Sequence, residues 1–268
     1  MKPFRVLDPN LPSLMARGLC ALAVMTKAPQ AGRVKTRLIP PLTPEEAAEL
    51  NRCFLRDTAI AISSVCSGGL RRPNADDTQL LPGAQKAPPQ CGPVAVYTPV
   101  GAESAYTDVL PADFSLLPQR GDKFGERLYL ALEDLFKCGF DSVCLIDSDS
   151  PTVPAENFAQ AVELLSASED RVVLGPSDDG GYYLIGMRKP HRQLFEKIDW
   201  STERVLNQTM QRAAEIDLEV KLLPTGFDVD DDASLRRLCN ELLGKQGDDS
   251  VAPSTRKFLA GLVAQKKL

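Results

Sequence analysis

Apolar runs and amphipathic periods alternate along most of the chain. Continuous apolar runs at 19–25 and 142–146 are typical of strands that are buried on both faces of a parallel sheet. A capping box, Thr43 with Glu46 and an intervening Pro44, predicts the start of a helix that continues to about residue 61. Further strands are predicted at 94–97, 171–174, 182–185 and 220–223, and further helices at 125–136, 154–165, 201–213, 233–243 and 254–263.

This alternation predicts an α/β fold, a single-domain Rossmann-like fold with a mostly parallel, doubly wound sheet and flanking helices. Ligands of such sheets bind at the carboxyl ends of the strands. We expect residues 1–18 to form an N-terminal extension and residues 19–268 to form the domain. The stretch 68–93 is rich in glycine, proline and polar residues, so we interpret it as a loop insertion and assign it no function.

The amino-acid composition argues against several classes of function. A net charge of −5 argues against a protein that coats nucleic acid, because such proteins need a basic face. The single histidine, His191, excludes sites that need two or more histidines from one chain. The seven cysteines form an odd set without a CxxC pair, which indicates reduced thiols and a cytoplasmic location. The apolar run at 19–25 is too short to span a membrane.

Four basic residues, Lys27, Arg33, Lys35 and Arg37, follow the first predicted strand, and Gly32 lies among them. A loop with several cations and a glycine that allows close backbone approach suits a diphosphate. It matches neither a P-loop nor a dinucleotide fingerprint. The alternative is a solvated basic loop with no ligand.

Aspartates follow three of the later predicted strands. Asp147 and Asp149 come directly after a buried strand and could hold Mg²⁺ or Mn²⁺, or could belong to a turn or a helix cap. Asp178 and Asp179 precede paired glycines, in a turn that could orient a sugar hydroxyl or an acceptor nucleophile. The last cluster is crowded enough that a divalent cation would relieve its repulsion, although Asp232 could simply cap the next helix. This cluster comprises Asp228, Asp230, Asp231 and Asp232.

Six ordered motifs between residues 19 and 243 resemble a known family. They look like the transferase 1 family associated with radical-SAM and selenodomain proteins, within the nucleotide-diphospho-sugar transferase superfamily. The resemblance implies a GT-A fold and glycosyltransferase activity, which in some members is assigned to arsenosugar biosynthesis. Phospholactate guanylyltransferase and the molybdenum-cofactor nucleotidyltransferases are similar in shape. The motifs lie at 27–37, 119–127, 146–151, 175–186, 199–202 and 227–230.

The resemblance also implies roles for individual residues. Asp149 falls on the family's metal-binding aspartate, and Asp228 and Asp230 match a late pair that helps hold the metal. Asp147 departs from the family pattern, where a small residue is usual. Gln119, followed by Gly121, is a plausible contact to base or ribose. The nucleotide-phosphate loop of the family corresponds to Lys27, Gly32, Lys35 and Arg37.

The sequence therefore predicts a metal-dependent glycosyltransferase with a nucleotide-diphospho-sugar donor, a small-molecule acceptor and Mg²⁺ or Mn²⁺ as cofactor. Asp178 or Asp179 would orient or deprotonate the acceptor hydroxyl, because no suitable histidine is present. One alternative is a nucleotidyltransferase that joins an NTP to a small phosphorylated substrate and releases pyrophosphate. The other is an inactive nucleotide-binding module. The sequence predicts no nucleic-acid partner and no membrane span, and leaves the oligomeric state open.

Overall fold

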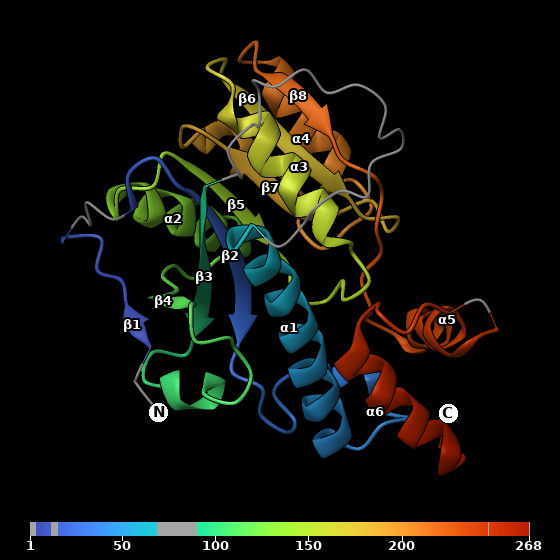
Figure 1. Cartoon of the computed structure of the whole chain (residues 1–268). Helices are drawn as coiled ribbons and strands as arrows, with labels where there is room; N and C mark the ends of the chain where they lie inside the picture. Colours follow the sequence, from blue (N-terminus) through green and yellow to red (C-terminus); the bar gives the residue numbers. More distant parts are fainter. Residues whose placement is uncertain (1–3, 12–15, 69–89, 246, 268) are drawn as a thin grey trace, which may run out of the picture.

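A computed structural model describes residues 4–11, 16–68, 90–245 and 247–267. These residues form an eight-stranded sheet with the strand order β1-β4-β3-β2-β5-β7-β6-β8 (Figure 1). The predicted α/β fold with a mostly parallel sheet and flanking helices is confirmed. The strands are β1 (Arg5–Val6), β2 (Cys20–Lys27), β3 (Cys91–Thr98), β4 (Ser115–Pro118), β5 (Ser142–Ile146), β6 (Arg171–Pro176), β7 (Tyr182–Met187) and β8 (Glu219–Leu222). The α-helices are α1 (Pro44–Cys66), α2 (Phe124–Lys137), α3 (Ala155–Ser166), α4 (Val205–Ala214), α5 (Asp232–Leu243) and α6 (Pro253–Ala264).

All pairings in this sheet are parallel except those of β7, which is antiparallel to both β5 and β6. The seven other strands consequently end at one edge of the sheet. The polar motifs recognised in the sequence follow β2, β4, β5 and β6, so the topology brings them to this common carboxyl edge.

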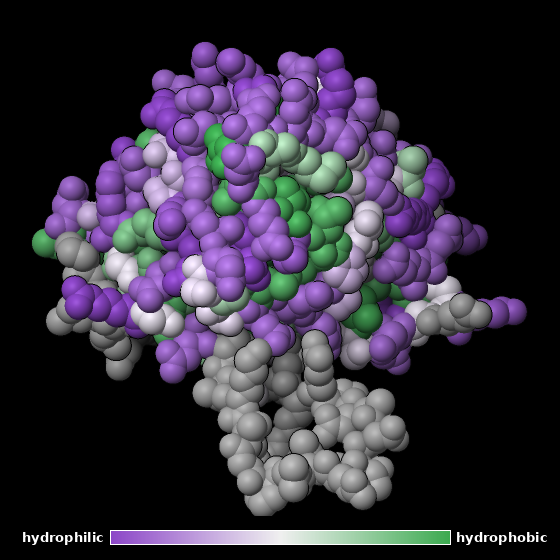
Figure 2. All heavy atoms as spheres, turned by 90° about the horizontal axis from the view of Figure 1, so that it is seen from above, coloured by the Kyte–Doolittle hydropathy of each residue, from purple (hydrophilic) through white to green (hydrophobic). Residues whose placement is uncertain are grey.

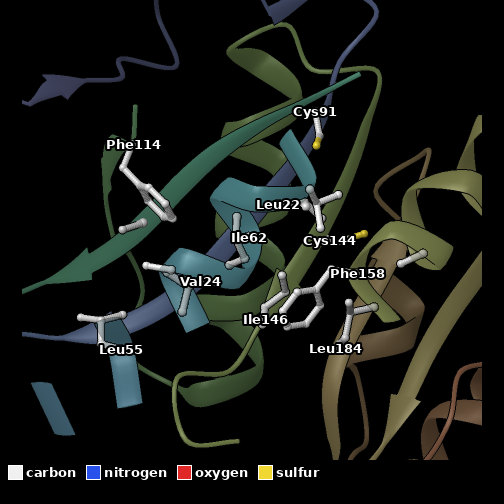
Figure 3. Packing of buried hydrophobic residues seen from close by; sticks show 14 of the residues in the cluster. Leu22, Val24, Leu55, Ile62, Cys91, Phe114, Cys144, Ile146, Phe158 and Leu184 are labelled. Atoms are coloured by element: carbon white, nitrogen blue, oxygen red, sulfur yellow. The ribbon is translucent and has the colours of Figure 1, made fainter. Parts of the chain in front are cut away.

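Alternating side chains of the central strands belong to two apolar layers, one on each face of the sheet. Leu22 and Val24 of β2 pack with α1 and α3 on one face, whereas Ala21 and Ala23 pack with α2 and α4 on the other (Figure 1). Figure 3 shows the first layer, where Ile62 of α1 and other labelled side chains pack over β2. Burial on both faces explains why these strands are continuous apolar runs in the sequence.

A third apolar cluster lies beyond the sheet, among the first half of α1, α5 and α6. The predicted capping box begins α1: the Thr43 hydroxyl accepts a hydrogen bond from the Glu46 amide at 3.2 Å, and the Glu46 carboxylate accepts one from the Thr43 amide at 2.9 Å. The Asp57 carboxylate, in the middle of α1, accepts the amide hydrogen bonds of Ser254 and Thr255. It thereby holds the start of α6 against α1.

One predicted helix start, at residue 201, is wrong. Ser201 has φ 64°, outside the helical region, and α4 begins only at Val205. Asp231 caps α5, because its carboxylate accepts the Ser234 amide hydrogen bond at 2.8 Å, while Asp232 is the first helical residue and pairs with Arg236 at 2.8 Å.

The interpreted loop at 68–93 lies mostly outside the described residues, and its end, Cys91 to Pro93, belongs to β3. Two strands were not predicted: β1, within the expected N-terminal extension, and β4, with which it pairs. The division of the chain into extension and domain stays a prediction.

No helix in the described part of the chain is long and apolar enough to cross a membrane. All seven cysteines are free thiols, and five are buried. His191 lies 3.2 Å from the Asp170 carboxylate on the surface, apart from the polar motifs. Figure 2, which views the molecule from above at the amino ends of β2 and β3, shows a mainly hydrophilic face with an apolar area near its centre. The polar motifs lie at the opposite edge.

Candidate functional site

The first acidic motif follows β5 directly, with bends at Ser148 and Asp149 and alternating burial. Ser148 and Ser150 are buried, so Asp147 and Asp149 lie together on the more open side. The Asp147 amide donates to the Tyr183 carbonyl at 2.9 Å, and the Ser150 hydroxyl donates to the Asp147 carboxylate at 2.7 Å. This part of the motif is therefore held in place by the neighbouring strand and by its own serine.

The second acidic motif shows the same alternation. Phe227 and Val229 are buried in the third apolar cluster, which leaves Asp228 and Asp230 on the opposite side of the chain. The Val229 amide donates to the Asp149 carbonyl at 3.1 Å. This backbone contact lays two segments that are 80 residues apart in sequence alongside each other, with their aspartates at one place.

Lys35 from the basic loop joins these two segments. Its ammonium lies 2.9 Å from Asp149 Oδ1 and 2.8 Å from Asp230 Oδ1, and donates to the Val229 carbonyl at 2.7 Å. The Lys35 side chain is only 5% exposed, whereas those of Asp149 and Asp230 are 34% and 49% exposed. We call this arrangement of Lys35, Asp149, Asp230 and the Val229 carbonyl the lysine cradle.

Two features show that the cradle constrains Lys35. Its backbone has φ 48° and ψ 37°, a left-handed conformation that is uncommon for a residue with a side chain. Burial alone would lower the pKa of the Lys35 ammonium, but the charges and hydrogen bonds of Asp149 and Asp230 outweigh burial and raise that pKa. Lys35 therefore stays charged inside the cradle.

The other two aspartates of these motifs, Asp147 and Asp228, have raised pKa values. Burial raises the pKa of Asp147 well above its usual range, and the neighbouring charge of Asp149 raises it further. Burial also raises the pKa of Asp228, with the charges of Asp179 and Asp230 as further causes. The Ser177 hydroxyl offsets part of this cost by donating to Asp228 at 3.1 Å. An additional positive charge at this site would relieve the repulsion.

Asp178 and Asp179 are adjacent, but they contact different partners. Asp178 pairs with Arg237 of α5, whose guanidinium lies 3.8 Å above the ring of Phe227. Asp179 Oδ1 accepts a hydrogen bond from the Gly181 amide at 2.8 Å. The turn needs glycine at position 180, because φ is 91° and a Cβ atom there would lie 2.2 Å from the Glu203 carbonyl oxygen.

The remaining predicted nucleotide-binding residues lie at the same edge without contacting the cradle. Lys27 is the exposed last residue of β2, and Arg37 is exposed and close enough to Asp231 to lower its pKa slightly, after the Ser234 hydrogen bonds. Gln119 extends β4, with its amide donating to the Tyr97 carbonyl at 2.8 Å. Gly32 and Gly121 have positive φ values of 70° and 97°, which favour glycine at both turns.

Sequence reasoning missed three side chains of this region. Ser150 and Ser177 donate hydrogen bonds to the carboxylates of Asp147 and Asp228. Both serines lie within motifs recognised in the sequence, so a hydroxyl residue near an aspartate could have predicted these contacts. Arg237 lies 59 residues from Asp178 in sequence, so no local sequence pattern predicts that ion pair.

The described residues contain no group of three or more histidine, cysteine, aspartate or glutamate side chains arranged to hold a metal ion. What they contain is a pair of carboxylates, Asp149 and Asp230, that already share one cation, the Lys35 ammonium. The oxygen atoms around it are of the type that Mg²⁺ and Mn²⁺ prefer, and Mg²⁺ is commonly held by one or two carboxylates together with substrate phosphates.

Comparison with known proteins agrees with this fold. Residues 84–202 match the model of a family described as uncharacterized proteins conserved in bacteria (DUF2064). A provisionally assigned nucleotide-diphospho-sugar transferase from Desulfovibrio desulfuricans G20 is 28% identical, with a TM-score of 0.73 over 92% of this chain and 96% of that chain. No curated protein matches the chain.

Two further solved structures are similar at lower identity and lower TM-score. One is CMP:2-keto-3-deoxy-manno-octonic acid synthetase complexed with CTP, with 10% identity, a TM-score of 0.49 and coverage of 82% and 97% of the two chains. Another is glucosyl-3-phosphoglycerate synthase from Mycobacterium tuberculosis with Mn²⁺ and UDP, with 12% identity, a TM-score of 0.43 and coverage of 92% and 79%.

Proposed function

We propose that this protein is a metal-dependent glycosyltransferase that uses a nucleotide-diphospho-sugar donor and a small-molecule acceptor. The observation that carries this proposal is the lysine cradle, which gathers a cation and two accessible carboxylates at the carboxyl edge of a parallel sheet. That edge is where sheets of this type bind nucleotides. The similarity to the Desulfovibrio protein supports the same class of donor.

The residues at the cradle fit a hard divalent cation. Asp149 and Asp230 keep a third to a half of their side-chain surface exposed while Lys35 lies buried against them, so both carboxylates remain accessible from solvent. Burial first, and the charges of neighbouring carboxylates second, raise the pKa values of Asp147 and Asp228, so a bound cation would favour their charged forms. When bound, Mg²⁺ or Mn²⁺ would neutralise the diphosphate that leaves the sugar.

The chain's own groups would then act on donor and acceptor. The exposed Lys27 and Arg37 supply hydrogen bonds and positive charge for the diphosphate, and Lys35 adds its charge from within the cradle. Gln119 and Gly121 lie at the same edge for base or ribose. In the transfer, the acceptor oxygen forms a bond to the anomeric carbon, the bond from that carbon to the diphosphate breaks, and the nucleoside diphosphate leaves. The acceptor proton passes to a carboxylate.

Asp179 is the better placed of the two aspartates to take that proton. The Asp178 carboxylate is engaged by the guanidinium of Arg237, whereas within the described residues Asp179 accepts only a backbone hydrogen bond from Gly181. Asp178 then acts as a positioning residue that ties the turn to α5.

The test is a panel of UDP- and GDP-sugars and of NTPs, each incubated with the protein and a mixture of hydroxylated acceptors, with and without Mn²⁺. We expect release of a nucleoside diphosphate from one sugar donor, dependent on Mn²⁺. Pyrophosphate release from an NTP would instead identify a nucleotidyltransferase, since both reactions need a cationic diphosphate site. Thermal stabilisation by nucleotide without turnover of any donor would indicate a binding module.

Asp149→Asn should lower the rate of this release by about 10²–10³ while leaving the fold intact. The matched control is Asp232→Asn, which removes the same charge from the same acidic run but at a residue that pairs only with Arg236 on the surface of α5. Full activity of Asp149→Asn would refute the role of the cradle.

A further inference from the structure

A cavity of about 590 Å³ lies beside the first turn of α2. Its walls come from α2 and from the connection between β7 and α4. Leu130, Ile198 and Trp200 contribute apolar or aromatic surface, and the exposed cations Lys123, Arg192 and Lys197 surround it. The cavity therefore combines an apolar lining with positive charge, a composition typical of sites for small ligands that are partly charged.

The cavity borders both halves of the proposed active site. On one side, a Cβ atom at Gly121 would lie 3.1 Å from Glu126 Cγ and from Leu130 Cδ1, and both of these residues line the cavity. On the other side, the segment that begins at Trp200 continues to Glu203, whose carbonyl lies against Gly180. Gly180 directly follows Asp179, the proposed base. The walls of the cavity are thus connected to Gly121 on one side and, through residues 200–203, to the turn that carries Asp179 on the other.

Trp200 is held in place by packing. A Cβ atom at Gly125 would lie 2.5 Å from the indole Nε1, so the glycine lets the ring lie directly against the first turn of α2. The ring of Phe124 meets it edge to face, with centroids 5.2 Å apart. A fixed indole that lines a cavity offers a preformed apolar surface for the body of a sugar or polyol, at little cost in side-chain entropy.

The acids of the cavity are already engaged. Glu126 accepts the amide hydrogen bonds of Asp122 and Lys123 at 3.0 and 3.4 Å, as part of the start of α2. Glu196 accepts from the Arg192 guanidinium at 3.0 Å. Both carboxylates are therefore committed to local contacts.

The two lysines differ from these acids. Within the described residues, neither the Lys123 nor the Lys197 ammonium takes part in an ion pair, although both residues line the cavity. Lys197 also has φ 57°, a strained backbone for a residue with a side chain, and such strain is concentrated at ligand sites. Two exposed ammonium groups beside an apolar wall would attract an anionic group on a ligand.

We propose that this cavity is the acceptor site, and that the acceptor is a sugar or polyol that carries a phosphate or a carboxylate. The inference rests on the proposed glycosyl transfer. Lys123 and Lys197 bind the anionic group, Trp200 packs against the carbon skeleton, and the reacting hydroxyl lies toward Asp179. A neutral sugar lacks the group that the two lysines recognise.

Trp200 is the chain's single tryptophan, so its fluorescence reports occupancy of this cavity without any need for turnover. The experiment titrates the full chain with glucose 6-phosphate, glucuronate and glucose at constant ionic strength. We expect a saturable change with at least one of the two anionic sugars and none with glucose at the same concentrations. Glucose 6-phosphate alone would assign the phosphate, and an equal response to glucuronate would assign either anion.

The variant Lys123→Gln with Lys197→Gln should weaken this binding about tenfold or more, because it removes both ammonium groups that would bind the anion. The control is Lys137→Gln at the other end of α2, where the ammonium pairs with Glu133 at 2.6 Å. An identical response to glucose, no response to either anion, or unchanged binding in the double variant would overturn the proposal.

Failure of this inference is distinguishable from failure of the proposed function. Saturable binding of an anionic sugar together with no nucleoside diphosphate release from any donor would contradict the transferase and support the cavity as a ligand site. Donor turnover with a neutral acceptor that is insensitive to the double lysine substitution would contradict the acceptor assignment and leave the transferase in place.

Discussion

The two Asp-x-Asp segments and the adjacent pair Asp178 and Asp179 use the same residue type with opposite results. In 147–149 and 228–230, the intervening residue is buried, and the two aspartates on either side of it are less buried. The two segments meet at Lys35, which contacts one aspartate from each. In the glycine turn, neighbouring carboxylates diverge, one to Arg237 and the other to a backbone amide. Aspartates two residues apart therefore bring their charges to one place, whereas the adjacent Asp178 and Asp179 bind different partners.

The largest expected effect comes from removing a negative charge from the two Asp-x-Asp segments. Asp149→Asn and Asp230→Asn should each lower the rate of donor turnover by about 10²–10³, the scale seen when one electrostatic stabiliser of a transition state is removed. Steady-state assays of nucleoside diphosphate release would measure this. Equal rates in the variants and in the native chain would contradict the shared cation site.

The next effect concerns stability. Lys35→Met leaves the carboxylates of Asp149 and Asp230 without their ammonium and should lower the free energy of unfolding by about 2 kcal/mol, less than for a fully buried pair because both carboxylates are partly exposed. Urea denaturation in a chelating buffer measures the loss. Added Mn²⁺ should restore part of it, because the ion takes over the same oxygen atoms.

The control for this stability measurement is Lys137→Met, at an exposed pair on α2, for which we expect a change below about 0.5 kcal/mol. A Lys35→Met variant as stable as this control would mean that the cradle contributes nothing to folding.

A smaller effect separates the two adjacent aspartates. Asp179→Asn should reduce the turnover rate about tenfold to a hundredfold, as expected for loss of a general base, with little change in the KM for the donor. Asp178→Asn keeps a hydrogen-bond acceptor for Arg237 and should change the turnover rate less than about threefold. If the two variants were reversed in severity, Asp178 rather than Asp179 would be the base.

The smallest effect is a pH dependence at Asp228. Because its folded-state pKa is raised, first by burial, the folded chain binds its proton more tightly than the unfolded chain does. The destabilisation is absent at pH values below the ordinary carboxyl range and develops as pH rises through the raised pKa. Asp228→Asn should therefore increase stability at neutral pH by less than about 1 kcal/mol, after allowance for solvent screening, and flatten the stability profile.

This pH effect would be read from melting curves recorded from pH 3 to 7 in a chelating buffer. The Ser177 hydroxyl can still donate to an asparagine oxygen, so the substitution isolates the charge. A variant that is less stable than the native chain at neutral pH would contradict the assigned direction of the pKa shift.

Local signals predicted the fold well where burial and capping dominate. The capping box at Thr43 and the continuous run Ser142–Ile146 lie where the sequence places them, because both depend on neighbours within a few residues. The helix predicted from residue 201 begins only at Val205, where the Leu206 amide donates to the carbonyl of the distant Gly180 at 2.8 Å, a contact that no local pattern predicts. The short β4 was missed because only four residues, ending in proline, form it.

The candidate site was likewise only partly predictable from the sequence. The aspartates and Lys35 could be selected from residue type and from their positions at predicted strand ends. Their meeting could not, because the contact between Asp149 and Val229 joins segments whose relative position depends on the whole sheet and on the third apolar cluster. The cavity beside Trp200 likewise depends on the glycine at position 125, which has no distinguishing local pattern.

The most direct test of the shared cation site is a calorimetric titration of the full chain with Mn²⁺, in the absence and presence of UDP and of GDP. The account predicts saturable binding that is tightened by one of the two nucleotides and is abolished by Asp149→Asn together with Asp230→Asn, while Asp232→Asn binds as the native chain does. Binding of Mn²⁺ that survives the double substitution, or no binding with either nucleotide, would contradict it.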